Sequence, residues 1–195
     1  AGLTESQKDC VFSVDTRKSS VMRKALELGI KFVNDVSALT YDSKSARLIA
    51  EKKLVVCLMH GGIDPKNMHK RNTYDNILLD VYDYLENRVQ HAVKSGIKKS
   101  NIVVDPGIGF GKKLEENLTL IRNASIFHGL GCPVLYGVSR KKFLGKITNV
   151  AQPEKRFPGS IAAALELIRQ GVQIIRVHDV EKTRQSIDFW NALNE

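Results

Sequence analysis

The sequence contains none of the features that identify a membrane protein or a disulfide-rich scaffold. No apolar run approaches the ~20 residues of a membrane span, so we expect no membrane partner. The three cysteines are widely spaced and form no CxxC pair. We therefore expect Cys10, Cys57 and Cys132 to be buried, reduced thiols of a cytoplasmic protein. Linkers and low-complexity segments are also absent, so we expect one domain over residues 1–195.

Several catalytic signatures are missing as well. The five histidines form neither an HxH nor an HExxH pattern, which argues against a catalytic zinc. Ser139 lies in no GxSxG elbow. The glycine-rich run 105–112 fails the dinucleotide template, because Lys112 replaces the third glycine, and it fails the P-loop template, because Lys113 replaces the Ser/Thr.

The net charge of +9 has three readings: a basic solvated surface, an anionic small substrate, or nucleic acid. The basic residues are spread along the whole chain. The densest cluster, Lys66 to Arg71, has only Tyr74 nearby for base stacking. We therefore expect no nucleic-acid partner.

One pattern is repeated six times: a short apolar run that ends in a polar residue, followed by a helix-like stretch. Such runs are typical of strands buried on both faces. Gly29, Gly96 and Gly171 follow predicted helices as carboxyl-end caps, and each precedes the next strand, which favours a parallel sheet. The predicted strands are 11–15, 31–35, 54–60, 101–105, 134–140 and 174–179, and the predicted helices are 18–28, 43–51, 74–95, 114–125, 160–170 and 180–193.

Polar residues at every strand end favour a TIM (β/α)8 barrel, although an open doubly wound sheet also binds ligands at its strand ends. A barrel needs ~250 residues, and the sequence shows only six βα units, so the chain has either a smaller α/β fold or a barrel with two units missing on the amino-terminal side. The long loops 61–72 and 141–158 follow strand ends, where we expect them to carry function.

Three segments are candidate sites. The alternate glycines after Asp105 either let the backbone approach a ligand or form a tight turn with positive φ angles. Buried Asp105 needs a partner, which a pterin or purine ring could supply. The segment 139–142 is either a solvated basic loop or a phosphate or carboxylate site. Arg176 and His178 alternate along a strand and so face one side, which suits a diphosphate, unless Arg176 is structural.

Together these segments resemble dihydropteroate synthase. The resemblance covers essentially the whole chain, in the right order. The motifs that carry it are Ser13-Val14-Asp15-Thr16, Asn34-Asp35, Cys57-Leu58-Met59-His60, Asp105-Pro106-Gly107-x-Gly109-Phe110-Gly111-Lys112, Gly137-x-Ser139-Arg140-Lys141 and Arg176-Val177-His178-Asp179.

The resemblance implies a cytoplasmic, homodimeric TIM-barrel transferase of folate biosynthesis, a target of sulfonamides. It condenses 6-hydroxymethyl-7,8-dihydropterin diphosphate with 4-aminobenzoate and releases pyrophosphate, using Mg2+. Pyrophosphate leaves first, and the aniline nitrogen attacks a pterin methyl cation that buried Asp15 and Asp105 favour.

The resemblance also implies a role for each matching residue. Asp15, Asp105 and Lys141 are expected to be catalytic. The expected pterin-binding set is Asp15, Asn34, Met59, Asp105 and Lys141; Phe110 and Ser139 are expected to bind aminobenzoate, and Arg176 and His178 to bind the diphosphate.

The first two strands of the family have no counterpart in the sequence. They carry the magnesium-binding asparagine and a loop that closes over both substrates, so we expect no metal ligand here, no lid and two exposed sheet edges. A folate-binding methyltransferase-type domain or a non-catalytic pterin-binding module is the alternative. The segment 139–141 and the pair Arg176 and His178 argue against it, because a methyl-transfer domain has no diphosphate to bind.

Overall fold

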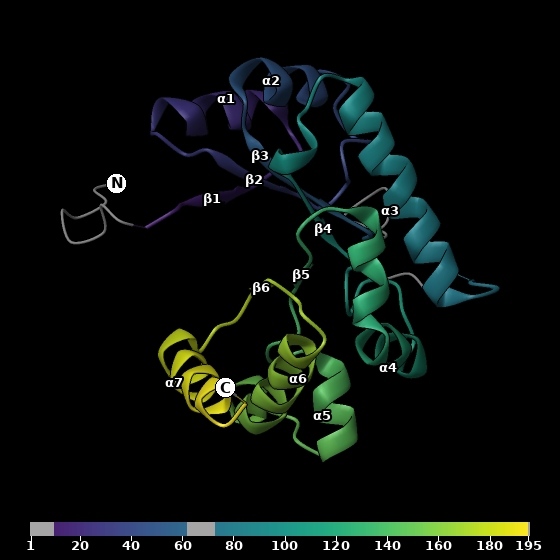
Figure 1. The fold of residues 1–195 in the computed structure, drawn as a ribbon, viewed down its shortest axis with the longest axis vertical. Coiled ribbons are helices and arrows are strands. Elements are labelled where there is room, and N and C mark those ends of the chain that lie inside the picture. Colours follow the sequence, from purple (N-terminus) through teal and green to yellow (C-terminus); the bar gives the residue numbers. More distant parts are fainter. Residues whose placement is uncertain (1–9, 62–72, 195) are drawn as a thin grey trace.

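Strands and helices alternate along the chain, as the sequence predicts. The computed structural model describes residues 10–61 and 73–194 (Figure 1). The strands are β1 (Ser13–Asp15), β2 (Phe32–Asp35), β3 (Val55–Met59), β4 (Ile102–Asp105), β5 (Leu135–Tyr136) and β6 (Ile174–Ile175). The α-helices are α1 (Ser19–Glu27), α2 (Ser45–Lys52), α3 (Ile77–Lys94), α4 (Leu114–Arg122), α5 (Lys142–Thr148), α6 (Phe157–Arg169) and α7 (Val180–Ala192), and the 3-10 helices are η2 (Lys99–Asn101), η3 (Ala124–Leu130) and η4 (Pro153–Arg156). Over the described ranges, no helix is long and apolar enough to cross a membrane.

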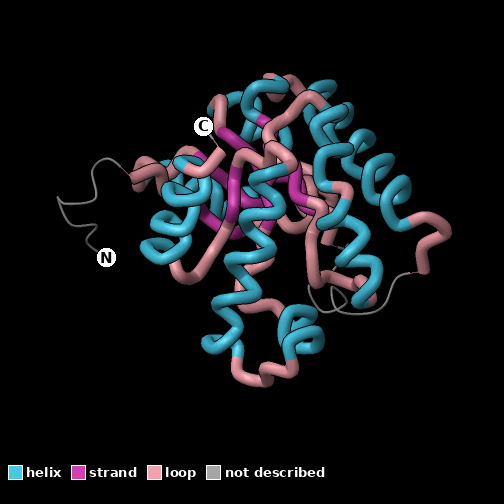
Figure 2. Tube along the Cα trace, turned by 60° about the horizontal axis from the view of Figure 1, so that its bottom comes forward, coloured by secondary structure: helices cyan, strands magenta, loops and turns pink. Residues whose placement is uncertain are grey.

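All strand pairs are parallel and follow chain order. The first four strands form one sheet in the order β1-β2-β3-β4, and β5 pairs with β6. A single bridge between Val104 and Val134 joins the two sheets. The strands gather in the middle of the molecule and the helices lie outside them (Figure 2). The six βα units of a barrel-type α/β fold are thus confirmed, and the described strands do not close into a complete barrel.

The core has two layers, because successive strand residues face opposite sides. Val56, Leu58 and Val104 belong to the large cluster that includes the buried faces of the helices. Cys57, Val103 and Leu135 form a smaller cluster on the other face of the strands, with Phe32, Val55 and Ile174 packed against it. The second cluster explains why the central strands read as unbroken apolar runs: both of their faces are covered.

The predicted helices are confirmed, with shifts at their ends. Gly29, Gly96 and Gly171 have φ angles of 80°, 92° and 82°, so they do end helices in the left-handed conformation. The fifth predicted helix, 160–170, begins earlier, at Phe157, because Pro158 is tolerated in a first helical turn. The fourth ends earlier, at Arg122, where η3 takes over.

The prediction that 141–158 is a loop is wrong, because it contains α5 and η4. Only Phe143 and Leu144 of α5 are buried, too few to give a helical repeat in the sequence. Left-handed Asn149 ends this helix, and an asparagine cap was the one available signal.

Two other expectations have mixed outcomes. Cys57 and Cys132 are buried free thiols, as predicted, but Cys10 is exposed. The basic cluster Lys66 to Arg71 and nearly all of loop 61–72 lie outside the described residues.

Candidate functional site

The candidate residues lie at or just beyond the carboxyl ends of the strands. On the β1–β2 side, the register places Asp15 opposite Asn34. The Asn34 Nδ2 group donates a hydrogen bond to Asp15 Oδ1. Asn34 is buried, and its Oδ1 atom has no hydrogen-bond partner in the described structure. Asp15 is exposed, so the expectation that it is buried is wrong.

Asp105, at the end of β4, is the most deeply buried carboxylate among the candidate residues. Its side chain is 1% exposed. Its Oδ1 accepts a hydrogen bond from the Gly107 N–H (2.8 Å), and its Oδ2 accepts one from Arg176 Nη2 (3.4 Å). The partner that buried Asp105 requires is therefore partly supplied by the protein itself. Met59 lies beside Asp105 in the β3–β4 register and is completely buried.

The glycine loop, residues 105–112, is a tight turn. Gly107, Gly109 and Gly111 all have positive φ angles, of 72°, 83° and 63°. A Cβ atom at Gly107 would overlap the carbonyl oxygen of His60. The glycine at 107 thus permits a close approach to the end of β3, and the turn reading of this motif is confirmed.

Lys112 fastens this loop to β3. Its Nζ donates to the carbonyl oxygens of His60 (3.1 Å), Gly107 (2.9 Å) and Phe110 (3.1 Å). It also lies 3.0 Å from His60 Nδ1. Neither Lys112 nor His60 has a role in the sequence prediction, although both stand in the quoted motifs; a lysine directly after a glycine turn was the available signal.

The pKa values of both His60 and Lys112 are lowered, in each case chiefly by burial. Burial, and then the Lys112 charge, lowers the pKa of His60 to about 3, so its imidazole is neutral. Burial lowers the pKa of Lys112 to about 7, against the opposing effect of Asp105. Since an ammonium only donates, the neutral ring accepts at Nδ1 and carries its proton on Nε2.

Lys141 connects the β5–α5 loop to the glycine loop. Its Nζ donates to the Ile108 carbonyl and lies 4.7 Å from the centroid of the Phe110 ring, a cation–π contact. Burial lowers the pKa of Lys141 to about 8; Asp105 opposes this shift and Arg176 adds to it. Lys141 is therefore mostly charged at neutral pH.

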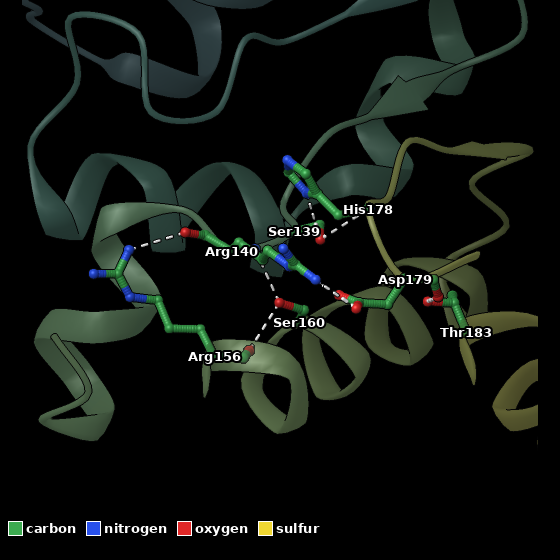
Figure 3. A network of polar contacts seen from close by, with 7 residues as sticks. All are labelled: Ser139, Arg140, Arg156, Ser160, His178, Asp179 and Thr183. Atoms are coloured by element: carbon green, nitrogen blue, oxygen red, sulfur yellow. Dashed lines mark hydrogen bonds and ion pairs between the residues drawn. The ribbon is translucent and has the colours of Figure 1, made fainter. Parts of the chain in front are cut away.

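Arg176 and His178 both lie near this region, but they contact different residues and do not face one ligand as a pair. Strand β6 ends at Ile175, so strand alternation does not extend to Arg176 and His178. Arg176 contacts Asp105, whereas the Nδ1 of exposed His178 lies 3.0 Å from Ser139 Oγ, which also accepts from the His178 N–H (3.3 Å). The Ser139–His178 contact is drawn in Figure 3.

A cavity of about 970 Å³ opens between the glycine loop and the α5–η4 segment. Phe110 and Lys141 line it, together with Lys142 and Lys146. Ser139 does not line it. Of the two residues expected to bind aminobenzoate, only Phe110 lines this cavity, whose walls are mostly apolar with lysine side chains among them.

The chain matches a family described as pterin binding enzymes over residues 1–178. The chain belongs to the pterin-binding enzyme family. This match ends at His178, so it spans all nine candidate site residues named above.

Relatives named dihydropteroate synthase match nearly the whole chain. A Haemophilus influenzae protein named dihydropteroate synthase is 37% identical over 184 residues, which are 94% of this chain and 66% of the relative. A dihydropteroate synthase of Xanthomonas albilineans, solved with 4-aminobenzoic acid, matches 97% of this chain and 67% of its own, with 36% identity and a TM-score of 0.89. That of Thermus thermophilus, solved with 6HMPPP, matches 94% and 72%, with 39% identity and a TM-score of 0.88. The chain spans about two thirds of the length of these relatives.

Proposed function

We propose that this chain carries the pterin-binding part of a dihydropteroate synthase. The observation that carries the proposal is a fully buried carboxylate, Asp105, which has an arginine at one oxygen. Its charge acts to raise the pKa values of two lysines, Lys112 and Lys141. A buried negative charge at the mouth of a parallel sheet is suited to a ligand with ring N–H and amino donors. Relatives of that name, solved with 4-aminobenzoic acid and 6HMPPP, support it.

The pterin ring would lie across the ends of β1, β2 and β4. Asp105 would accept from ring nitrogen or amino groups, and the Oδ1 atom of Asn34, which has no partner in the described structure, would accept another. Lys141 would donate from the opposite loop, with Asp15 at the exposed edge and Met59 beneath. Satisfying the Asn34 oxygen removes the cost of an unpaired buried acceptor.

The reaction we propose is a dissociative substitution. The bond between the pterin methylene carbon and the diphosphate oxygen breaks, and pyrophosphate leaves with the electron pair. Arg176 is 39% exposed and its contact with Asp105 is long, at 3.4 Å, so it can turn to the leaving group together with exposed His178. The Asp105 carboxylate stabilises the cationic ring. The aniline nitrogen then forms the new C–N bond and releases one proton to the solvent.

The cavity beside Phe110 is the proposed aminobenzoate site. Phe110 offers its ring face, and Lys142 offers a cation for the carboxylate. Ser139 is engaged with His178 outside this cavity. We therefore propose Lys142 for the carboxylate contact and assign Ser139 to orienting His178.

Magnesium and the homodimer are implied by the resemblance. Within residues 10–61 and 73–194, no group of three or more His, Cys, Asp or Glu side chains could hold a metal ion, so we derive no step through Mg2+.

The resemblance to homodimeric proteins directs attention to α7, which exposes Phe189, and to its carboxyl end, which exposes Leu193 one helical turn further on. In a homodimer, a second copy of the chain would cover these two side chains. Sedimentation of the Phe189→Ser variant as a monomer would support an interface at α7.

Calorimetric titration with the dihydropterin diphosphate, with and without Mg2+, tests the function. We expect saturable binding by this chain and roughly 5- to 150-fold weaker binding by Asp105→Asn. Asp188→Asn, on the surface of α7, is the matched control and should bind as the parent does. A folded parent chain that fails to bind the pterin would contradict the proposed function.

A further inference from the structure

Arg140 has a backbone conformation that an arginine rarely adopts. Its φ angle is 59°, in the left-handed region where a Cβ atom is unfavourable. It stands between Ser139 and Lys141, whose side chains each contact another loop. A strained residue of this kind persists only where its surroundings hold it.

Arg140 is held by contacts with three other residues, drawn in Figure 3. Its Nε and Nη2 groups donate to the two carboxylate oxygens of Asp179, at 3.0 and 2.6 Å. Its backbone N–H donates to Ser160 Oγ (3.0 Å), and its carbonyl accepts from Arg156 Nη1 (2.9 Å). The residue is therefore fixed through its side chain and through both of its peptide groups.

The holding residues are themselves well fixed. Arg156 is buried, and its other guanidinium groups donate to the carbonyls of Val150 and Ala151. Ser160 Oγ donates to the Arg156 carbonyl (2.8 Å), which joins the two supports. These contacts involve only protein groups, so the network is complete without a ligand.

The left-handed turn sends the two neighbours of Arg140 to different partners. Ser139 meets His178 in the loop after β6. Lys141 meets Ile108 and the Phe110 ring in the glycine loop after β4. Through Asp179, which directly follows His178, the same residue also ties the β6–α7 loop to the β5–α5 loop.

We propose that Arg140 is a positioning residue of the pterin site: pinned in the left-handed conformation by Asp179, Ser160 and Arg156, it aims Ser139 and Lys141 and sets the spacing of the β4, β5 and β6 loops. This inference rests on the proposed function for its consequence, which is ligand affinity. The positioning of the loops is argued from the structure alone, because the Arg140 guanidinium already binds Asp179 without any substrate.

The test compares Arg140→Ala, which loses the ion pair and keeps the unfavourable Cβ, with Arg140→Gly, which loses the pair but is at ease at positive φ. Arg140→Lys keeps one charged contact. Arg184→Ala removes a surface Arg–Asp pair of similar length, 2.7 Å, on α7 and is the matched control. The affinity for the dihydropterin diphosphate is measured by calorimetry, and amide hydrogen exchange is followed over residues 138–142 and 176–179.

We expect Arg140→Ala to bind the pterin diphosphate about tenfold more weakly, since small misplacements of binding groups have effects of this order or larger. Arg140→Gly should lose less, Arg140→Lys should recover part of the affinity, and Arg184→Ala should be unchanged. Exchange should accelerate in both loops in Arg140→Ala but not in β3 and β4.

A purely structural role would lower the unfolding temperature and leave the affinity of the folded protein unchanged, which would overturn the inference. Unchanged exchange in the two loops would overturn it as well. If the parent chain does not bind the pterin, the proposed function fails, and the exchange measurement still decides whether Arg140 positions the loops.

Discussion

The two sides of the candidate site differ in how completely their polar groups are satisfied. On the β4–β6 side, Asp105, Lys112 and Ser139 all have partners within the protein. On the β1–β2 side, Asp15 is exposed and the buried Oδ1 of Asn34 has no partner in the described structure. The β4–β6 side is fixed by its internal hydrogen bonds, and the β1–β2 side has an unpaired hydrogen-bond acceptor.

This difference separates residues that shape the site from residues that are available to a ligand. Satisfied buried polar groups make a site rigid, because breaking any one contact exposes an unpaired group. Unsatisfied groups gain more from a ligand, because the ligand removes an existing cost. We therefore expect substitutions on the β4 side to affect both stability and binding, and those on the β1 side to affect binding alone.

The largest effect is expected from Gly107→Ala. A Cβ at this position overlaps the His60 carbonyl, a backbone atom that cannot move aside, and φ is positive. Overpacking costs about 1–3 kcal/mol and left-handed strain about 1–2 kcal/mol, so we expect a loss of about 2–5 kcal/mol in the free energy of unfolding, measured by urea denaturation.

Gly29→Ala is the matched control for this substitution. Gly29 has a similar φ of 80°, but a Cβ there would meet nothing within 4 Å. It should lose only the conformational part, about 1–2 kcal/mol. Equal losses in the two variants would show that the contact with β3 is unimportant.

Asp105→Asn should have the next largest effect, which is a loss of affinity for the pterin. It removes the charge that pairs with Arg176 and leaves a buried amide beside it. Losing one partner of a buried hydrogen-bonded group costs about 1–3 kcal/mol, or roughly 5- to 150-fold in pterin affinity by calorimetry. Asp15→Asn, at the exposed edge, should cost less than Asp105→Asn and leave the unfolding free energy unchanged. The reverse order would sink the comparison between the two sides.

Raising the pH should weaken pterin binding and stabilise the unliganded fold at the same time. The pKa of Lys141 is about 8, so its charged fraction falls between pH 7 and 9 and affinity should drop up to about tenfold. In the folded protein the pKa values of Lys112 and Lys141 lie below their usual range near 10.4. The unfolded chain then binds more protons than the folded one, so their contribution to stability rises with pH across this window.

Calorimetry at pH 7, 8 and 9, with urea denaturation at each pH, checks both trends. Lys141→Arg keeps its charge throughout and should flatten the fall in affinity. If this variant shows the same decline as the parent, the decline belongs to another group, and Lys112, whose pKa is about 7, is next to be tested.

The sequence was informative wherever an apolar repeat or a glycine determined the local structure. It predicted the order of strands and helices, the helix-ending role of Gly29 and the burial of Asp105 at the end of β4. It could not predict that Lys112 would point inward, because a lysine in a loop is usually solvated. It also misjudged Asp15, because burial at a strand end depends on what covers that strand, which no local pattern encodes.

The sequence also did not predict which residues the site side chains would contact. Alternation placed Arg176 and His178 on one side of a strand, yet β6 ends at Ile175 and the two side chains reach different partners. Asp105 and Arg176 are 71 positions apart in the chain. Contacts over such separations follow from how the loops pack, so they became visible only in the folded arrangement.

Ser139→Ala has the smallest expected effect. It tests whether a hydrogen bond on the β4–β6 side, where polar groups are paired within the protein, contributes to ligand binding. Its hydroxyl contacts His178 at both Nδ1 and N–H, and one hydrogen bond is worth about 0.5–1.5 kcal/mol. We expect an affinity loss of about fivefold for the pterin diphosphate and none for 4-aminobenzoate, both by calorimetry. Lys142→Met should show the opposite preference, because Lys142 lines the cavity beside Phe110. If Ser139→Ala instead weakens aminobenzoate and Lys142→Met does not, Ser139 holds the carboxylate, and its contact with His178 must open when that substrate binds.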